Sequence, residues 1–378
     1  MNFDKDILDI YADYIITALG KQVTATELSL LLNGTISNDK ISRFLGGVYQ
    51  KDKILQHSEL TSKELWGLVK SSVRKYETED SCIVIDDTIQ EKQYSDENDI
   101  ICWHFDHCEG RNVKGVNLLN FLLCTPEVNI PIALEVVKKT EEVIKIVDDK
   151  EIRTCKSKVT KNEMAQNQII YCIENAIKFR HFLFDIWFAS NQTLELIHSY
   201  GKKYVVPIKK NRKIVFSHKD KLKGNWKKIE SLSQVENQII ENTPTEVWLE
   251  GLNHSVLLIK QVFTNKDGST GIQFLITNDF DLDTVDKIKQ LYQKRWQVEE
   301  YHKSLKSNLS LAKAPTKTVF TGINHFFCCA YSFLKLELLT KATKVENHFQ
   351  LKNKLYFQAM QSATKQLALM RAEFGCER

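Results

Sequence analysis

The first 75 residues place apolar side chains at helical spacing and carry few signals of strands. Residues 26–32 predict one short helix, and a break follows at Asn33-Gly34-Thr35. Ser37 is a typical N-cap for a second helix, which ends at Gly46-Gly47. Two short helices around a glycine-containing turn form the layout of a helix-turn-helix DNA reader, although the same layout is more common in ordinary helix packing.

From Ser81 the pattern changes to short apolar runs that are typical of strands. The expected order is strands at 82–85, 100–107, 116–124 and 132–137, a helix at 161–179, a strand at 181–184, a helix at 192–200 and a strand at 204–208. This order predicts an α/β or α+β core around a mixed sheet. Asp87 and Asp185 each end an apolar strand, which is where the active sites of such sheets lie.

The rest of the chain divides into a part with strand signals and a part with helix signals. Residues 209–278 are rich in strand signals and predict a β-rich insertion, and the chain is helical from Asp283 to its end. We therefore expect four regions: a helical N-terminal DNA-binding region at 1–78, a catalytic core at 79–208 and 279–340, the insertion at 209–278, and a helical C-terminal region at 341–378. The apolar segment 323–339 is interrupted by Asn324, His325, Lys335 and Glu337, so it predicts a buried helix and no membrane span.

Composition is that of a globular protein, with 43% hydrophobic and 26% charged residues and a formal charge of +4. The charge is unevenly placed, because eleven Lys or Arg residues lie between Lys202 and Lys228 against the single acid Asp220. Such a run is usually a solvated face, but it also suits a phosphate backbone. On the second interpretation Lys209, Lys210 and Arg212 are candidate DNA contacts.

The nine cysteines form no CxxC pair and indicate reduced thiols. The N-terminus lacks the basic start and apolar stretch of a signal peptide. We therefore expect a cytoplasmic protein that is associated with the nucleoid when it is bound to DNA, without a membrane partner.

The segment from Tyr292 to Lys306 contains no Gly or Pro and predicts one continuous helix. At about 100° per residue, Tyr292, Arg295, Glu299 and Lys306 share a single narrow stripe. Arg295 and Glu299 are spaced as an i,i+4 surface ion pair, which contributes only a few tenths of a kcal/mol. Alternatively the acid binds a metal ion while the cations hold phosphate oxygens. Spacing alone does not decide between these interpretations.

The same four residues carry a family resemblance. Their pattern, Tyr-x2-Arg-x3-Glu-x6-Lys, resembles the signature of insertion-sequence transposases of the DDE class, which have a ribonuclease-H-like fold. Asp86-Asp87-Thr88 at a strand end, the pair Arg295-Trp296 and the stretch 106–117 are also similar to that family. The resemblance covers roughly residues 80–340.

The resemblance implies a set of functional residues. Asp87, Asp185 and Glu299 would form the catalytic, metal-binding triad, with Asp86 as the alternative to Asp87. Tyr292, Arg295 and Lys306 would contact DNA phosphates near the cut. One departure is visible: Ile186-Trp187-Phe188 follows Asp185, where the family more often has a small residue before its aromatic. In the insertion, Trp226 and Trp248 would be candidates for stacking on a flipped base.

Three converging carboxylates repel one another unless cations lie between them, so the triad predicts two Mg²⁺ or Mn²⁺ ions. The expected function is metal-dependent cleavage at transposon ends and strand transfer into target DNA, by a homodimer when DNA is bound. Two alternatives remain open. One is a catalytically inactive, transposase-derived DNA-binding regulator, and the other is a ribonuclease-H-like nuclease that cuts DNA without joining it.

Overall fold

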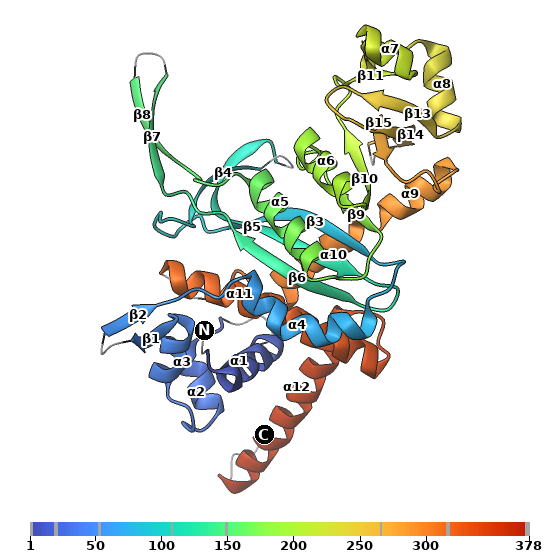
Figure 1. The fold of residues 1–378 in the computed structure, drawn as a ribbon. Coiled ribbons are helices and arrows are strands. Elements are labelled where there is room, and N and C mark those ends of the chain that lie inside the picture. Colours follow the sequence, from blue (N-terminus) through green and yellow to red (C-terminus); the bar gives the residue numbers. More distant parts are fainter. Residues whose placement is uncertain are drawn as a thin grey trace. The chain divides into compact units, whose positions relative to one another are not determined.

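The computed structural model describes residues 3–18, 22–51, 54–106, 109–147, 150–264, 267–314 and 318–374 (Figure 1). Two compact units are present, and neither is a continuous stretch of chain. The first unit comprises Met1–Val69, Ile89–Val116 and Tyr301–Arg378, and the second comprises Lys70–Thr88 and Asn117–Glu300. The strands β3 and β5 and the helices α4 and α10 continue from one unit into the other.

The second unit is built on a mixed sheet, as the sequence predicts. Its order is β12-β11-β13-β14-β15-β10-β9-β3-β5, and β6 also pairs with β5. The central strands are β3 (Cys82–Glu91), β5 (Arg111–Cys124), β6 (Asn129–Val136), β9 (His181–Phe184) and β10 (Lys203–Ile208). β9 lies parallel to both β3 and β10, and all four of its residues are buried. Burial on both faces explains why this strand reads as a continuous apolar run.

The helices α5 (Lys161–Glu174) and α6 (Asn191–Ser199) flank β9 in the chain. α5 begins with a capping box between Thr160 and Glu163, and it ends five residues before the predicted Phe179. The prediction of its end was wrong because Ala176 adopts a positive φ of 51°. The Arg74 guanidinium binds the carbonyl groups of Asn175 and Ala176, at 2.5 and 2.8 Å, and so satisfies the freed end of the helix.

The insertion contains the predicted strands and also helices that were not predicted. Its elements are β11 (Lys213–Val215), α7 (His218–Lys223), β12 (Lys227–Lys228), η1 (Ile229–Ser231), α8 (Gln234–Asn242), β13 (Thr245–Leu249), β14 (Ser255–Thr264) and β15 (Thr270–Thr277). Ser217 and Ser233 cap α7 and α8. β15 pairs with β10, so the insertion continues the core sheet. A separate hairpin, β7 (Glu141–Val147) and β8 (Lys150–Lys156), was also not predicted.

The first unit is mainly helical. It contains α1 (Lys5–Thr17), α2 (Ala25–Leu31), α3 (Asn38–Leu45), the hairpin β1 (Val48–Lys51) and β2 (Ile54–His57), β4 (Cys102–Asp106), α11 (Val319–Thr343) and α12 (His348–Glu373), together with the first part of α4 (Ser62–Tyr76). α2 and α3 confirm the predicted helix pair, whereas the β1–β2 hairpin was not foreseen. The strand predicted at 100–107 is β4, and His107 lies outside the described residues.

α11 is the buried helix predicted around residues 323–339, and its polar residues have partners inside the unit. The side chain of Asn324 accepts from the backbone N–H of Leu60 and donates to the carbonyl of Leu45. His325 lies 3.0 Å from the Tyr11 hydroxyl. Among the described helices, none combines the length and apolar character needed to cross a membrane.

The predicted continuous helix from Tyr292 to Lys306 is in fact two helices, α9 (Val285–Gln293) and α10 (Trp296–Asn308). Lys294 and Arg295 form a turn between them. Here the backbone changes to tighter i,i+3 hydrogen bonds, from Arg295 N–H to Tyr292 and from Val298 N–H to Arg295. The prediction failed because no Gly or Pro marks the change. The four residues of the stripe are therefore divided among α9, the turn and α10.

Candidate active site

Asp86 and Asp185 extend the register of two neighbouring parallel strands. Cys82 to Ile85 of β3 pair in order with His181 to Phe184 of β9. Asp86 and Asp185 are the next residue of each strand, so they lie on the same side of the sheet. Asp185 ends its strand as predicted, whereas β3 runs on to Glu91.

Asp86 is a nearly buried carboxyl group in a cluster of like charges. Its pKa is raised to about 7, mainly by burial, while the Arg295 guanidinium opposes the rise and Glu299, Asp87 and Asp185 contribute to it. A carboxylate in this setting is costly to ionise without a cation nearby. The cluster therefore has the electrostatic character of a cation site.

Arg295 is the cation that the protein itself supplies. Its guanidinium lies 3.2 Å from Asp86 and 3.4 Å from Glu299, and its side chain is only 17% exposed. Burial by itself lowers the pKa of Arg295, but Tyr292, Asp86, Asp185 and Glu299 raise it above its usual value. The turn before α10 thus directs one positive group towards three acids.

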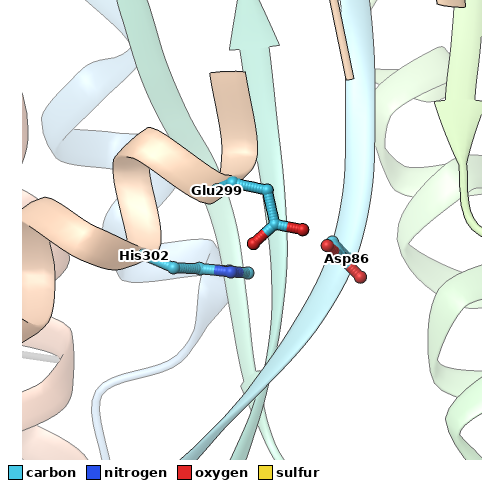
Figure 2. A group of neighbouring side chains, drawn as sticks. All are labelled: Asp86, Glu299 and His302. Carbon is cyan, nitrogen blue, oxygen red and sulfur yellow. The ribbon is translucent and has the colours of Figure 1, made fainter. Parts of the chain in front are cut away.

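Glu299 and His302 stand one turn apart on α10, facing Asp86 (Figure 2). Each of the three side chains offers a ligand atom, and these atoms lie within 4.8 Å of one another. The donor set of two carboxylate oxygens and one imidazole nitrogen suits a divalent cation such as Mn²⁺, and its oxygen atoms also suit Mg²⁺. The residues present therefore fit a metal ion.

Asp87 points to the other side of β3, as alternation along a strand requires. One of its carboxylate oxygens lies 2.8 Å from the Lys161 ammonium and accepts a hydrogen bond of 2.7 Å from the Asn117 amide. These partners come from α5 and β5. The structure thus brings Asp86, Asp185 and Glu299 together around Arg295, and it gives Asp87 a separate set of partners.

Comparison with known families bears on the same segments. The chain matches the family described as DDE superfamily endonuclease over residues 8–227, and the family described as Transposase DDE domain over residues 158–321. The chain belongs to the DDE superfamily endonucleases. No curated protein matches the chain.

Membership makes this DDE endonuclease a transposase-type nuclease, and its mixed sheet with helical ends is consistent with a ribonuclease-H-like fold. Enzymes of this superfamily generally use divalent metal ions. Sequence reasoning missed one residue of the endonuclease's candidate metal site, namely His302. A signal was available, because the spacing Glu299-x-x-His302 places both side chains on one helix face.

Tyr292, at the end of α9, is the aromatic neighbour of this cluster in the endonuclease. The centre of its ring lies 5.9 Å from the guanidinium carbon of Arg295. Burial raises the pKa of Tyr292 above its usual value, and the nearby Asp185 and Asp86 add to that effect. The phenol therefore stays protonated. Lys306, two turns beyond Glu299 on α10, is exposed, and its role stays a prediction.

Lys209 and Lys210 are exposed at the end of β10 and line an open groove of about 1150 Å³ within the second unit. An adjoining hollow of about 200 Å³ is lined by Trp187, Lys209 and Arg212 among others. Trp187 lies two positions after Asp185 in the chain. Arg212 is half-buried and bonds to Asn191. The Lys209 ammonium lies 4.5 Å from the centre of the Trp187 ring. Cations and an exposed aromatic ring thus line this hollow.

Trp226 and Trp248, the aromatic residues predicted from the insertion, are both half-buried. The Lys221 ammonium lies 4.0 Å from the centre of the Trp248 ring, and the His218 ring lies 5.0 Å away. Stacking of a DNA base on either tryptophan stays a prediction.

Proposed function

We propose that this endonuclease is a DNA transposase that cuts the ends of a transposon and joins the freed 3′ ends to target DNA. The observation that carries the proposal is the cluster of Asp86, Asp185 and Glu299 on one side of the sheet, with Arg295 between them. Family membership supports a nuclease, and the charge pattern of the cluster supports metal-dependent chemistry on a phosphodiester.

In this proposal Asp86, Asp185 and Glu299 are the catalytic carboxylates, and His302 is an additional ligand. Asp86 replaces Asp87, the residue implied by the family resemblance, because Asp86 shares its register with Asp185 while Asp87 is engaged by Lys161 and Asn117. Two Mg²⁺ or Mn²⁺ ions held by such a set would neutralise the phosphate charge and activate first a water molecule and then the DNA 3′-hydroxyl.

The protein groups have distinct tasks in this mechanism. The planar guanidinium of Arg295 holds two phosphate oxygens, which aligns the scissile phosphate with the carboxylates. The protonated Tyr292 phenol donates a hydrogen bond to the same backbone. Lys209, Lys210, Arg212 and Lys306 hold the flanking DNA as counter-charges. The N-terminal helices α2 and α3 are the proposed reader of the terminal repeats, and two chains pair the two ends in the cytoplasm.

The test uses the full-length protein and a supercoiled plasmid carrying the DNA that flanks its coding sequence. With Mg²⁺ we expect nicks at the element ends, and with a second plasmid we expect joined products. Glu299→Gln should abolish both while retaining end binding in a gel-shift assay. Glu300→Gln, an exposed neighbour on the same helix, is the matched control.

Each alternative function has its own outcome. Normal nicking by Glu299→Gln would overturn the assignment of the catalytic glutamate. Binding without cutting by the wild-type protein would favour the inactive regulator. Cutting without joining would favour the simple nuclease.

A further inference from the structure

The open groove of about 1150 Å³ lies wholly within the second unit, because its lining residues fall between Ile186 and Phe274. It begins one residue after Asp185 and extends past the end of β10 to β14, β15 and α8. Sites for single small molecules have volumes of roughly 300–1000 Å³. A groove of this size and openness therefore suits a segment of a longer chain.

The floor of the groove is apolar. Ile208, Ile229 and Phe274 line it and are buried. Ile272 and Phe263 also line it, and they remain 56% and 42% exposed. Covering such side chains is favourable, at roughly 25 cal/mol for each Å² of apolar surface. The backbone of a DNA duplex offers these side chains no apolar surface, whereas the faces of unpaired bases do.

The ring of Phe263 is held in place by a glycine. Phe263 on β14 and Gly271 on β15 are cross-strand partners. A Cβ atom at Gly271 would collide with the phenyl ring, so the ring occupies the space that a side chain at this position would need. A ring that already rests against backbone loses little freedom when a flat group stacks on it. Phe263 therefore has the form of a stacking platform for a base.

The rim of the groove carries cations and side-chain amides. Lys209 and Lys210 are exposed at the end of β10. The amides that line the groove are those of Asn211, Gln234, Asn237 and Gln273. Lysine binds phosphate, and amides exchange hydrogen bonds with the edges of unpaired bases. Among the described residues that line the groove Glu230 is the one acid, and it lies 3.4 Å from the Lys228 ammonium. The rim therefore favours an anionic chain.

We propose that this groove binds an unpaired strand of DNA, with its bases on the apolar floor and its phosphates at Lys209 and Lys210. The inference rests on the proposed function, because a cut beside Asp185 frees nucleotides to leave the duplex where the groove begins. An acidic peptide would satisfy the lysines but would leave the ring of Phe263 without a flat partner. A duplex would likewise leave the apolar floor uncovered.

The first experiment measures binding of the full-length protein to fluorescein-labelled oligothymidylate by fluorescence anisotropy, in EDTA so that no DNA is cut. A blunt duplex of the same length and unrelated sequence is the second probe. We expect the single strand to bind about tenfold more tightly than the duplex. Phe263→Ala should weaken single-strand binding by about tenfold or more and leave duplex binding unchanged. Phe280→Ala removes a ring that is 47% exposed and does not line the groove, so it should change neither.

Two further variants separate the platform from the rim. Gly271→Ala displaces the ring of Phe263 without removing it, so it should reproduce the loss seen for Phe263→Ala. Lys210→Ala should weaken binding and lower the salt dependence, reducing the slope of log K against log salt by about 0.7 for the single strand. Urea unfolding checks that every variant keeps the stability of the wild type.

Competition decides between a DNA strand and an acidic peptide. Unlabelled oligothymidylate should displace the probe at least about tenfold better than oligoglutamate of equal charge, and equal competition would overturn the proposal. Equal affinity for single strand and duplex, or single-strand binding that tolerates Phe263→Ala, would overturn it as well. Glu299→Gln should bind the single strand like the wild type in EDTA, which separates this groove from a failure of the proposed catalysis.

Discussion

The ammonium nitrogen of Lys161 lies 2.8 Å from a carboxylate oxygen of Asp87, on the side of β3 opposite to Asp86. This ion pair gives Asp87 a partner that comes from the protein itself. Asp86 has a different environment, in which burial raises its pKa to about 7 and Arg295 is the nearest cation. Of these two consecutive acids, Asp87 is therefore paired with a lysine of the protein, whereas Asp86 lies in an environment that favours a bound cation.

The first prediction separates these two acids. Asp86→Asn should lower metal-dependent nicking by about 100-fold or more, because a carboxylate that shares the proposed ions is lost. Asp87→Asn should retain activity within about tenfold, since an amide still accepts a hydrogen bond from Lys161. Initial nicking rates at saturating Mg²⁺ measure both. Equal losses in the two variants would count against the choice of Asp86.

The second prediction concerns Arg295. Arg295→Ala removes the positive group from beside the nearly buried Asp86, so the free energy of unfolding should fall by about 2 kcal/mol in metal-free buffer. Added Mn²⁺ should recover part of this loss, because a bound cation replaces the missing charge. Chemical denaturation with and without Mn²⁺ measures the effect. Lys294→Ala, at the exposed neighbouring position, should change neither value.

The third prediction concerns the choice of metal. The imidazole of His302 favours Mn²⁺ over Mg²⁺, because Mg²⁺ prefers oxygen ligands. His302→Ala should therefore reduce nicking with Mn²⁺ more than nicking with Mg²⁺, lowering the ratio of the two rates by about tenfold. Rates measured at saturating concentration of each ion give the ratio. An unchanged ratio would show that His302 does not contact the metal.

The fourth prediction is a loss of stability in acid caused by His254. Its ring stacks on His198, with ring centres 3.6 Å apart, and accepts or donates a hydrogen bond of 2.9 Å with the Tyr204 hydroxyl. The pKa of His254 is lowered to about 4, mainly by burial and then by the neighbouring His198, while Glu195 opposes the shift. Between pH 6.5 and about 4 the unfolded chain thus binds a proton that the folded protein does not.

Stability from this group should therefore be fully present above pH 6.5 and fall as the pH drops towards 4, by about 1.4 kcal/mol for each pH unit. His254→Asn should flatten this part of the profile, and His218→Asn, at an exposed position, should not. Unfolding midpoints in urea between pH 7.5 and pH 4.5 provide the measurement. A wild-type profile identical to that of His254→Asn would contradict the assignment.

The sequence predicts the central strands well because their apolar runs are sharply bounded. The strand at 181–184 was placed correctly, since its four apolar residues are followed directly by Asp185. β9 is buried on both faces, so its sequence does not alternate between apolar and polar residues. The β7–β8 hairpin was missed for the opposite reason. Its strands are crowded with charged residues and stand as a separate two-stranded sheet, so no buried face imposes an apolar pattern.

The sequence could not choose between Asp86 and Asp87, because adjacent residues of a strand differ only in the face that they occupy. The choice depends on pairing with β9, nearly 100 positions away in the chain, and on contacts with Lys161 and Asn117. The break before α10 was equally invisible. At Lys294 and Arg295, i,i+3 backbone hydrogen bonds replace the i,i+4 bonds of an α-helix, and no Gly or Pro in the sequence marks this change.

The pairing of Ile208 with Phe274 on β10 and β15 has a consequence for how this enzyme can vary. The chain leaves the core and returns to it at two points that lie side by side on one ladder. Growth, loss or exchange of the chain between these two points therefore leaves the spacing of Asp185 and Glu299 to the core strands and helices. The insertion can diversify, or be grafted by an engineer, while the cutting chemistry stays the same.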